Sequence, residues 1–302
     1  MSPHVTQGRL AGAAPVVGMV LSGGGARGFA HIGTLRALER HGVQVEVWAG
    51  TSIGAIIAAL AAHGYRAADL LELARAVSWR DVFDLSLRAG MIKGEKLHAL
   101  LAEHLPERFE DLGARLAVTC TDIESGEEIV LTSGDLVKAV RASACFPGAF
   151  EPVSYLGRTL ADGGICNNLP VDALATLNAD VTIASDVTPP RRAAYHAPSD
   201  DPRSWWERVV ATVTLEQRTP MAAVTLRSTD IMMRLLTDAQ YVHHPADLRI
   251  AHELPTVRVE SFWDLEAVVE AGEAEAERVL NANTDWLQRF ARGAPRTDGA
   301  VH

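Results

Sequence analysis

The stretch VWAGTSIGAIIAAL, residues 47–60, limits the fold of this chain more than any other. A short apolar run enters a turn in which Ser52 lies between Gly50 and Gly54, and isoleucines at helical spacing follow. A GxSxG sequence between a strand and a helix is typical of a nucleophile elbow, a sharp turn that exposes a serine side chain. Glycine is favoured there because larger neighbours would clash with the strained backbone of the serine. The pattern predicts a nucleophilic Ser52; a small residue in a tight turn is the structural alternative.

A second glycine-rich turn, SGGGARG at residues 22–28, follows an earlier apolar run at residues 16–21. Such a continuous run is typical of a strand that is buried on both faces. Helical spacing begins at Phe29 and stops at Gly42, and residues 43–48 resemble another strand before the elbow. Strand, helix, strand and helix at these lengths predict an α/β fold with parallel strands and crossover helices.

The two glycine-rich turns are expected to lie side by side, because adjacent parallel strands end at the same edge of a sheet. Open α/β sheets bind their ligands at that edge. The backbone N–H groups of Gly24 and Gly25, with that of Ile53, would then converge on one carbonyl oxygen as an oxyanion hole. One site built from both turns is the simplest interpretation.

Two alternatives for the glycine-rich turn remain open. Gly23, Gly25 and Gly28 also match GxGxxG, the dinucleotide-binding fingerprint. That fingerprint needs an acidic residue about 20 positions further on, at the end of the second strand. Glu46 lies near this distance but inside the predicted strand, so the acid is poorly placed. The glycines would also serve if they only let a helix pack closely on the sheet.

A nucleophilic serine needs a general base, which is most often a histidine oriented by an acid. None of the eleven histidines has a convincing strand-end context; those considered were His31, His196, His243, His244 and His252. A carboxylate does: in LADGGICNNLP, residues 160–170, Asp162 follows a short strand and precedes a glycine pair. Asp162 is the candidate base, and a plain Asp-Gly hairpin turn is the alternative.

The remaining chain predicts further elements of the same fold. They are a helix over residues 97–105, a hairpin of residues 115–121 and 127–132, a helix over 136–144, a buried strand over 181–187, a proline-rich loop over 189–202, and mostly helices beyond it, with a strand around residues 248 and 249. The charged run EAGEAEAERVL is expected to be only the solvent-facing surface of a helix. We expect a flexible leader at 1–15, a single domain at 16–290 and a flexible tail at 291–302. Within that domain, the catalytic core covers about 16–187 and a mostly helical part about 203–290.

Composition limits the partners. With 302 residues and a net charge of −10, the chain has too few clustered cations for nucleic acid or for a purely electrostatic dock on anionic lipid. Three scattered cysteines indicate neither a disulfide framework nor a metal site. No signal peptide is recognisable, and the longest apolar stretch is shorter than the roughly 20 residues that span a bilayer. We therefore expect a soluble cytoplasmic protein of undetermined oligomeric state that touches membranes transiently at most. For Trp205 and Trp206 we expect packing, with a membrane-touching or lid surface as the alternative.

The ordered set GGGARG, GTSIG and DGG, with RASACFPGAFEP at residues 141–152 before the last, resembles the patatin-like phospholipase family. The resemblance covers about residues 16–187 and continues more loosely through ADLRI and FWDLEAVVEAGEAEAERV. It implies a three-layer α/β/α fold with a mainly parallel central sheet. It also implies a Ser–Asp dyad in place of a triad.

The resemblance assigns roles to individual residues of this chain. Ser52 is the nucleophile within an elbow that includes Thr51, and Asp162 is the base. Gly163 and Gly164 complete a DGG motif where relatives often carry DGA. The oxyanion hole is implied to comprise Gly23, Gly24, Gly25, Ala26, Arg27, Gly28 and Ile53.

The implied activity is hydrolysis of acyl esters of lipids through an acyl-serine, without metal or cofactor. A transacylase or a non-hydrolytic regulator that keeps the same site stays open, as does a nucleotide-binding protein. An Asp pKa near its usual value of about 4 would make Asp162 a weak base.

Overall fold

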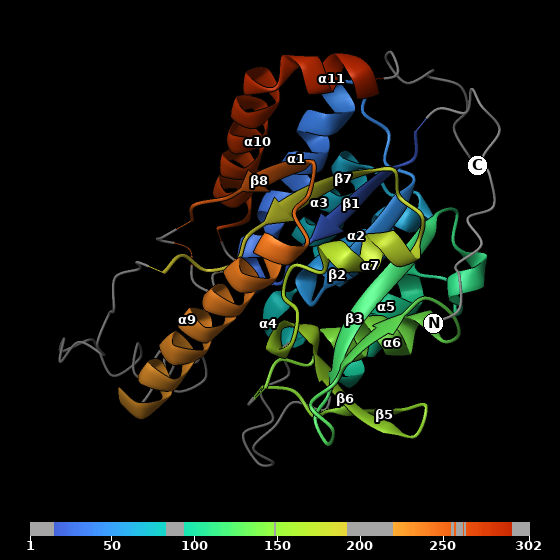
Figure 1. Ribbon diagram of the computed structural model, residues 1–302. Helices are drawn as coiled ribbons and strands as arrows, with labels where there is room; N and C mark the ends of the chain where they lie inside the picture. Colours follow the sequence, from blue (N-terminus) through green and yellow to red (C-terminus); the bar gives the residue numbers. More distant parts are fainter. Residues whose placement is uncertain are drawn as a thin grey trace, which may run out of the picture.

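A twisted, mostly parallel sheet forms the centre of the fold (Figure 1). The computed structural model describes residues 15–82, 94–147, 149–191, 220–254, 257, 262 and 264–291. The strands are β1 (Val17–Leu21), β2 (Val47–Thr51), β3 (Arg115–Asp122), β4 (Glu128–Leu131), β5 (Val153–Tyr155), β6 (Arg158–Asp162), β7 (Val181–Asp186) and β8 (Leu248–Ala251). Their order is β5-β6-β3-β2-β1-β7-β8, with β4 also paired to β3. Strands β3, β2, β1, β7 and β8 run parallel, while β4, β5 and β6 pair antiparallel.

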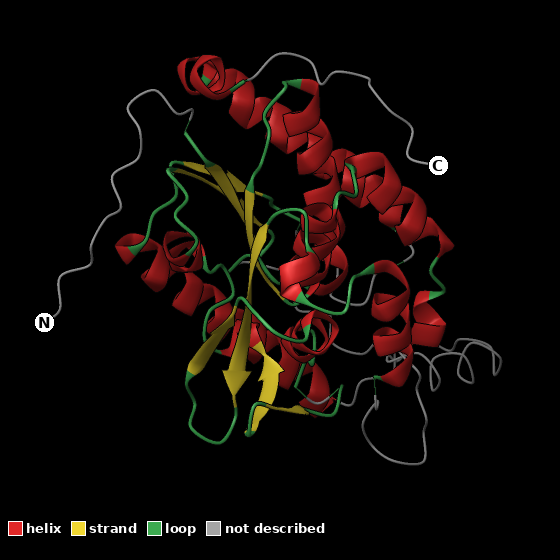
Figure 2. Cartoon of the chain, turned by 90° about the vertical axis from the view of Figure 1, so that its right-hand side faces the viewer, coloured by secondary structure: helices red, strands yellow, loops and turns green. Residues whose placement is uncertain are grey.

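Helices lie on both sides of the strands (Figure 2). They are α1 (Phe29–Arg40), α2 (Ile53–His63), α3 (Ala67–Ala76), α4 (Trp79–Val82), α5 (Glu95–His104), α6 (Leu136–Ser143), α7 (Val171–Thr176), α9 (Pro220–His243), α10 (Leu265–Ala282) and α11 (Thr284–Phe290). Three short 3₁₀ turns join them: η1 (Gly25–Gly28), η2 (Phe109–Asp111) and η3 (Gly163–Ile165). The expected three-layer α/β/α architecture is confirmed.

Alternating side chains of the strands build one core on each face of the sheet. In β1, Met19 and Leu21 join the larger core with helices α1, α2, α3, α5, α6 and α10. Val20, between them, joins the smaller core with α7. Because both faces of the sheet are covered, the sequences of its strands are continuous apolar runs, which is typical of parallel sheets.

The carboxyl ends of β2 and β6 meet head to head along β3. Thr51 at the end of β2 pairs with Thr119 of β3, and Asp162 at the end of β6 pairs with the next residue, Cys120. Strand β4 pairs with Thr119 and Cys120 along one edge of β3. Strands β2 and β6, which pair with the same two residues, must therefore both lie along the other edge of β3. One strand residue advances about 3.4 Å, so this register brings the turn after β2 next to Asp162.

The predicted adjacency of the two glycine-rich turns is confirmed: β1 and β2 are parallel, with Leu21 opposite Gly50. The second strand was predicted too early, however, since β2 begins at Val47. Val43 instead forms an isolated bridge with Ala291. The predicted hairpin of β3 and β4 is also confirmed.

The charged run EAGEAEAERVL is more than a solvent-facing surface, so that expectation was wrong. It belongs to α10, one face of which packs on α1, and Ala276 and Leu280 of the run are fully buried. A side chain at Gly33 of α1 or at Gly272 of α10 would overlap the other helix's backbone. Glu273 forms ion pairs with two arginines of α1. The patterned charges therefore help to orient a helix that covers α1.

Several predictions fall outside the described residues. These are the leader before residue 15, the tail after residue 291, most of the proline-rich stretch, His196, Trp205 and Trp206. The domain division stays a prediction. Among the helices that the structure describes, none combines the length and the apolar character needed to cross a bilayer.

Candidate active site

Ser52 occupies a strained turn at the N-terminus of α2. Its backbone has φ 56° and ψ −126°, which L-residues rarely adopt. The Ser52 N–H donates to Ser143 Oγ at 2.9 Å, and the Ser143 hydroxyl donates to the carbonyl oxygen of Thr119 at 2.6 Å. The strained conformation is thus held from α6 and β3, as a nucleophile elbow requires.

The flanking glycines are required by close packing. A Cβ at Gly54 would overlap the Leu21 carbonyl oxygen, because the first turn of α2 lies directly against the end of β1. A Cβ at Gly50 would approach the backbone of Gly54 to 2.6 Å. Thr51, inside the motif, donates its hydroxyl to the Asn167 carbonyl oxygen at 2.9 Å. Gly50, Thr51 and Gly54 of the GTSIG motif therefore each contribute to the geometry of the turn.

Asp162 is buried beside the elbow, with 3% of its surface exposed. Its Oδ1 accepts the Gly164 N–H at 2.8 Å. Burial raises the pKa of Asp162 to about 6, against the lowering effects of the Ser52 side chain and the Gly164 N–H. Its Oδ2 is buried and has no hydrogen bond of standard geometry among the described residues. The Ser52 side chain is nevertheless near enough to the carboxyl group to lower its pKa. Catalytic hydrogen bonds are often long before substrate binds.

This raised pKa corrects the expectation of a weak base with an ordinary pKa. A carboxylate with a pKa near 6 is a stronger base than one near 4, yet it is largely ionised at pH 7. The cause is burial, and the same buried surroundings raise the pKa values of the neighbouring Cys120 and Cys145 thiols, to which the charge of Asp162 adds a smaller contribution.

The glycine-rich turn lies against the elbow. A Cβ at Gly23 would be 3.2 Å from the Ser52 Cβ, and a Cβ at Gly28 would overlap the Ile53 side chain. The Gly23 N–H is already bound to the Asn168 carbonyl oxygen at 3.1 Å. Within the described part of the chain, the N–H groups of Gly24 and Gly25 bind no protein acceptor. These two remain available for an oxyanion, whereas the Gly23 N–H is occupied.

Arg27 and Ala26 are buried beneath the turn in η1. The Arg27 guanidinium lies 3.9 Å from Asp230 of α9. A second tie to α9 runs from Arg234 to the buried carboxylate of Asp186 at the end of β7, at 3.3 Å. Ion pairs thus hold α9 across the carboxyl edge of the sheet.

Asn168, which was not a candidate from the sequence, connects the glycine-rich turn to the DGG motif. Its Nδ2 donates to the Gly23 carbonyl oxygen at 3.1 Å and to Thr188 Oγ1 at 2.9 Å. A Cβ at Gly23 or Gly164 would meet Asn168 Oδ1 at 2.5 or 2.9 Å. Asn168 therefore leaves no room for a side chain at Gly23 and little room for one at Gly164. Its signal was its place six residues after Asp162 in the quoted stretch.

The acid that a dinucleotide site needs lies at the wrong end of the sheet. Glu46 comes just before β2, whereas the glycine-rich turn follows the carboxyl end of β1. The length of a five-residue strand, about 17 Å, separates the two. This position disfavours the nucleotide-binding alternative.

Two histidines, His31 and His252, are buried together, and neither has a hydrogen bond to Ser52 among the described residues. His31 Nε2 lies 2.9 Å from the Ser22 carbonyl oxygen, so this nitrogen carries the proton, and Nδ1 accepts from Ser185 Oγ at 2.8 Å. His252 Nε2 lies 3.1 Å from the same Ser185 Oγ. Burial lowers the pKa of His31 to about 3 and that of His252 to about 4, so both are neutral. The network anchors Ser22, the first residue of the glycine-rich turn.

His243 and His244 are exposed at the end of α9. Among the residues that the structure describes, no group of three or more His, Cys, Asp or Glu side chains is arranged to hold a metal ion.

Comparison with known proteins identifies relatives of this chain. A curated relative from Mycobacterium tuberculosis, an uncharacterised NTE family protein, is 33% identical over 210 residues, which cover 66% of this chain and 57% of the relative. The lysophospholipase NTE1 of Scheffersomyces stipitis is 35% identical over 179 residues, 57% of this chain and 12% of that protein. The match thus spans little more than half the length of the mycobacterial relative and about an eighth of the length of NTE1.

Among solved structures, VipD from Legionella pneumophila has a similar fold. Its TM-score is 0.54 at 16% identity, and the match covers 89% of this chain and 67% of VipD. The model of the patatin-like phospholipase family matches residues 19–175, which include both glycine-rich turns, Ser52 and Asp162. The chain therefore belongs to the patatin-like phospholipase family.

Proposed function

We propose that this protein is a serine acyl hydrolase that cleaves acyl esters of lipids through Ser52 and Asp162. The observation that carries the proposal is the contact between a serine in a strained turn and a buried carboxylate whose pKa is raised to about 6. Strain of this kind persists where the surrounding structure holds it, and it is concentrated at functional sites. The family description and the lysophospholipase among the relatives support lipid esters as the substrate class.

In the acylation step, Asp162 takes the proton of the Ser52 hydroxyl as Oγ attacks the ester carbonyl carbon. The carbonyl electron pair moves onto oxygen, where the N–H groups of Gly24, Gly25 and Ile53 stabilise the charge. The N-terminus of α2 adds its positive dipole end. Collapse of this intermediate breaks the ester bond, and the departing alcohol takes the proton from Asp162. The acyl group stays on Ser52.

In the deacylation step, Asp162 takes a proton from water, and the resulting hydroxide attacks the acyl-serine. As the second tetrahedral intermediate collapses, its bond to Ser52 Oγ breaks, Asp162 returns the proton to Oγ, and the fatty acid is released. The same groups act twice, so one site suffices for both halves of the reaction. If an alcohol replaces water in this step, the same site transfers the acyl group.

The test is a substrate panel with purified wild-type protein and Ser52→Ala. The panel holds p-nitrophenyl esters, lysophosphatidylcholine and phosphatidylcholine, with and without glycerol as an acyl acceptor. We expect wild-type protein to release free fatty acid and Ser52→Ala to lose about 10³-fold or more of the activity. Ser133→Ala, at an exposed serine, should keep full activity.

A fluorophosphonate should form an adduct on Ser52 that mass spectrometry locates. Hydrolysis that survives in folded Ser52→Ala, or an adduct only elsewhere, would refute the nucleophile. Predominant acylated glycerol would identify a transacylase. Absence of both reactions together with a Ser52 adduct would favour a non-hydrolytic role.

A further inference from the structure

Helix α9 carries apolar side chains on its outer face. Over residues 224–243, the exposed positions recur at intervals of three and four, so they share one face of the helix, here called the α9 face. Its large apolar members, which are 36–77% exposed, are Val224, Ile231, Met232, Leu235, Leu236 and Val242. Its other members are Thr225, Ser228, Ala239 and His243. Within this range, no exposed residue is Asp, Glu, Lys or Arg.

The charged side chains of α9 face the body of the protein instead. They are only 18–27% exposed, and they belong to Arg227, Asp230, Arg234 and Asp238. The last three form ion pairs with residues outside α9, at 2.8–3.9 Å. A surface helix of a globular protein normally has the opposite arrangement, with apolar residues inside and charged residues in water. Ion pairs therefore hold α9 with its apolar face outward.

Helix α9 also adjoins the DGG motif. A Cβ at Gly164 would be 3.5 Å from the Met233 Cε. One turn later, the Gln240 Nε2 donates to the Cys166 carbonyl oxygen at 2.9 Å. Ile165 lies between these two contact points in the chain, and it is 44% exposed. Exposed apolar side chains therefore continue from α9 to the turn that follows Asp162.

The α9 face suits a lipid surface in length and in charge. From Val224 to Val242 the helix advances about 27 Å. Helices with one apolar face bind in the plane of a lipid interface, with that face at the boundary between headgroups and acyl chains. Anionic lipid attracts clusters of Lys and Arg, but the described part of this face has none, and the whole chain has a net charge of −10. A zwitterionic surface therefore fits better than an anionic one.

We propose that the α9 face docks on the surface of a zwitterionic lipid bilayer and so brings the carboxyl edge of the sheet to its substrate. The proposal rests on the proposed function, hydrolysis of lipid acyl esters at Ser52. Large exposed apolar patches mark sites that meet proteins or membranes. A second copy of the chain on this face would cover the same edge of the sheet and obstruct the approach of a lipid to Ser52. A lipid surface instead presents the substrate where α9 and Ile165 lie.

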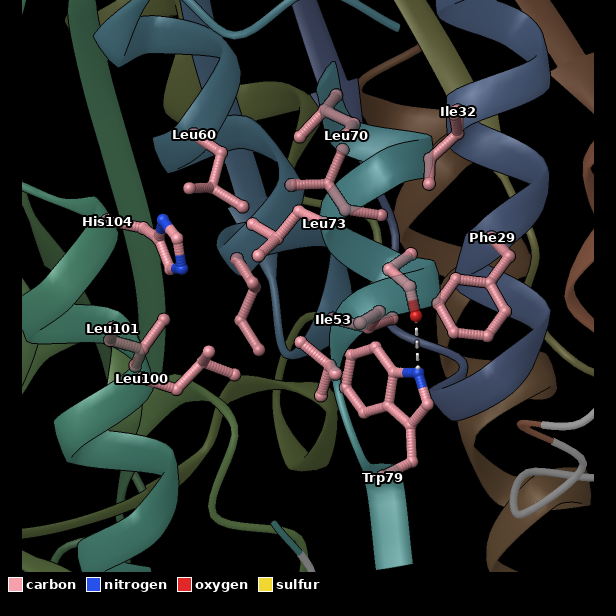
Figure 3. Close-up of a pocket in the computed structure, with 14 residues that line it drawn as sticks. Phe29, Ile32, Ile53, Leu60, Leu70, Leu73, Trp79, Leu100, Leu101 and His104 are labelled. Atoms are coloured by element: carbon pink, nitrogen blue, oxygen red, sulfur yellow. Dashed lines mark hydrogen bonds between the residues drawn. The ribbon is translucent and has the colours of Figure 1, made fainter. Parts of the chain in front are cut away.

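The apolar pocket along α2 offers no such surface (Figure 3). Its volume is about 40 Å³, and most of its lining comes from helices α1 to α5. Phe29 and Ile53, which line it, belong to the larger core and are almost fully buried. This pocket is a packing gap between helices, whereas the α9 face lies on the outside of the molecule.

The first test measures flotation of Ser52→Ala, which does not consume lipid, with phosphatidylcholine vesicles. Binding should saturate and change less than about 2-fold between about 50 and 500 mM NaCl, because salt screens charges and not apolar contacts. Adding Met232→Glu or Val242→Glu should weaken binding at least about 10-fold, since a carboxylate resists leaving water. Leu156→Glu is the matched control, at a 70% exposed leucine in the turn between β5 and β6. It should bind as Ser52→Ala does.

Absence of binding, or equal binding by the parent and all three variants, would overturn the proposal. Kinetics then separate docking from chemistry. In the active protein, Met232→Glu should hydrolyse soluble p-nitrophenyl butanoate within about 2-fold of wild type, but lipid esters in phosphatidylcholine vesicles more than about 10-fold more slowly. Equal rates on vesicles would overturn the proposal, while Ser52-dependent butanoate hydrolysis upheld the proposed function. Loss of all Ser52-dependent hydrolysis in wild type would instead count against the proposed function.

A fluorescent label on the α9 face identifies what covers it. Met232→Cys is labelled with the polarity-sensitive dye NBD in a Ser52→Ala, Cys166→Ser background, because Cys120 and Cys145 are buried. Its emission should shift to the blue when phosphatidylcholine vesicles are added, and doxyl-labelled phosphatidylcholine should quench it. Emission that is already blue without lipid and unchanged by lipid would overturn the proposal. Sedimentation velocity would then distinguish a second copy on the face from cover by other residues of the same chain.

Discussion

The Ser52 N–H donates a 2.9 Å hydrogen bond to the hydroxyl of Ser143, a residue 91 positions further along the chain. The same hydroxyl donates to the Thr119 carbonyl oxygen, so one buried side chain connects the elbow, α6 and β3. This bond fixes the backbone of the nucleophile independently of the glycines around it. Ser143 therefore positions Ser52 without touching the reacting atoms.

Ser143→Ala should lower kcat about 10- to 100-fold with little change in KM, because a displaced nucleophile loses its alignment with the carbonyl carbon. The lost hydrogen bonds should also lower the free energy of unfolding by about 1–2 kcal/mol. Ester kinetics and urea unfolding measure the two effects. Ser154→Ala, at an exposed serine of β5, should change neither. A fully active Ser143→Ala would show that the elbow does not depend on this bond.

The pH dependence of kcat/KM should follow the ionisation of Asp162. Only the carboxylate accepts the Ser52 proton, and burial raises the pKa of this group to about 6. Activity on a soluble ester should therefore rise with pH through about 6 and level off above about 7. The acidic limb should persist in His252→Ala, which separates it from a histidine titration. A profile flat from pH 5 to 8 would contradict the assignment.

The raised pKa of Asp162 also makes the stability of the protein depend on pH. The folded-state pKa of Asp162 lies above its usual value, so folding favours the protonated form. This contribution to stability is fully present below about pH 4 and is lost as the pH rises through about 6. Asp162→Asn removes this pH dependence. The change that it causes in the free energy of unfolding should therefore be more favourable at pH 7.5 than at pH 4, by about 1–3 kcal/mol. Urea unfolding at the two pH values measures the difference.

Substituting the histidines should leave the chemistry largely intact. We expect His196→Ala, His243→Ala and His244→Ala to keep kcat within about 3-fold. His252→Ala should destabilise the protein by about 1–3 kcal/mol, because it removes one hydrogen-bond partner from each of the buried hydroxyl groups of Thr34 and Ser185. Its folded fraction, counted by fluorophosphonate titration, should remain active. A histidine variant that folds but loses as much activity as Ser52→Ala would establish a triad.

Chelation should not affect hydrolysis of a soluble short-chain ester. The proposed donors to the oxyanion are backbone N–H groups, and the proposed base is a side chain of the protein itself. Activity on p-nitrophenyl butanoate should be equal before and after dialysis against EDTA. A soluble substrate is essential here because calcium also changes the packing of lipid aggregates. Complete loss that calcium restores would contradict the mechanism.

Local patterns predicted the elbow and the pairing of β1 with β2 because strand, turn and helix signals lie within a few residues of one another. The relations that depend on distant parts of the chain escaped such reasoning. Ser143 and Asn168 act through residues 91 and 145 positions away. The burial that raises the pKa of Asp162 arises only when β6 meets β3. The contact of α10 with α1 was hidden for the same reason, since its charges read as solvent-exposed.

The early start predicted for the second strand has a different cause. Val43 and Val45 are apolar and β-branched, like the residues of β2 that follow them. Propensity therefore cannot separate the approach to the strand from the strand itself. Pairing with β1 decides the boundary, and it begins at Val47.

The central claim is that Ser52 and Asp162 act as one catalytic unit. The most direct measurement is kcat/KM on a soluble ester for Ser52→Ala, Asp162→Asn and the double variant, each with its fold verified. Asparagine keeps the shape of Asp162 but cannot accept the Ser52 proton. Each single variant should lose about 10³-fold or more, and the double variant should be little worse than either, since residues of one catalytic unit are strongly non-additive. Losses that multiply in the double variant, or an Asp162→Asn protein with near-wild-type activity, would contradict the dyad.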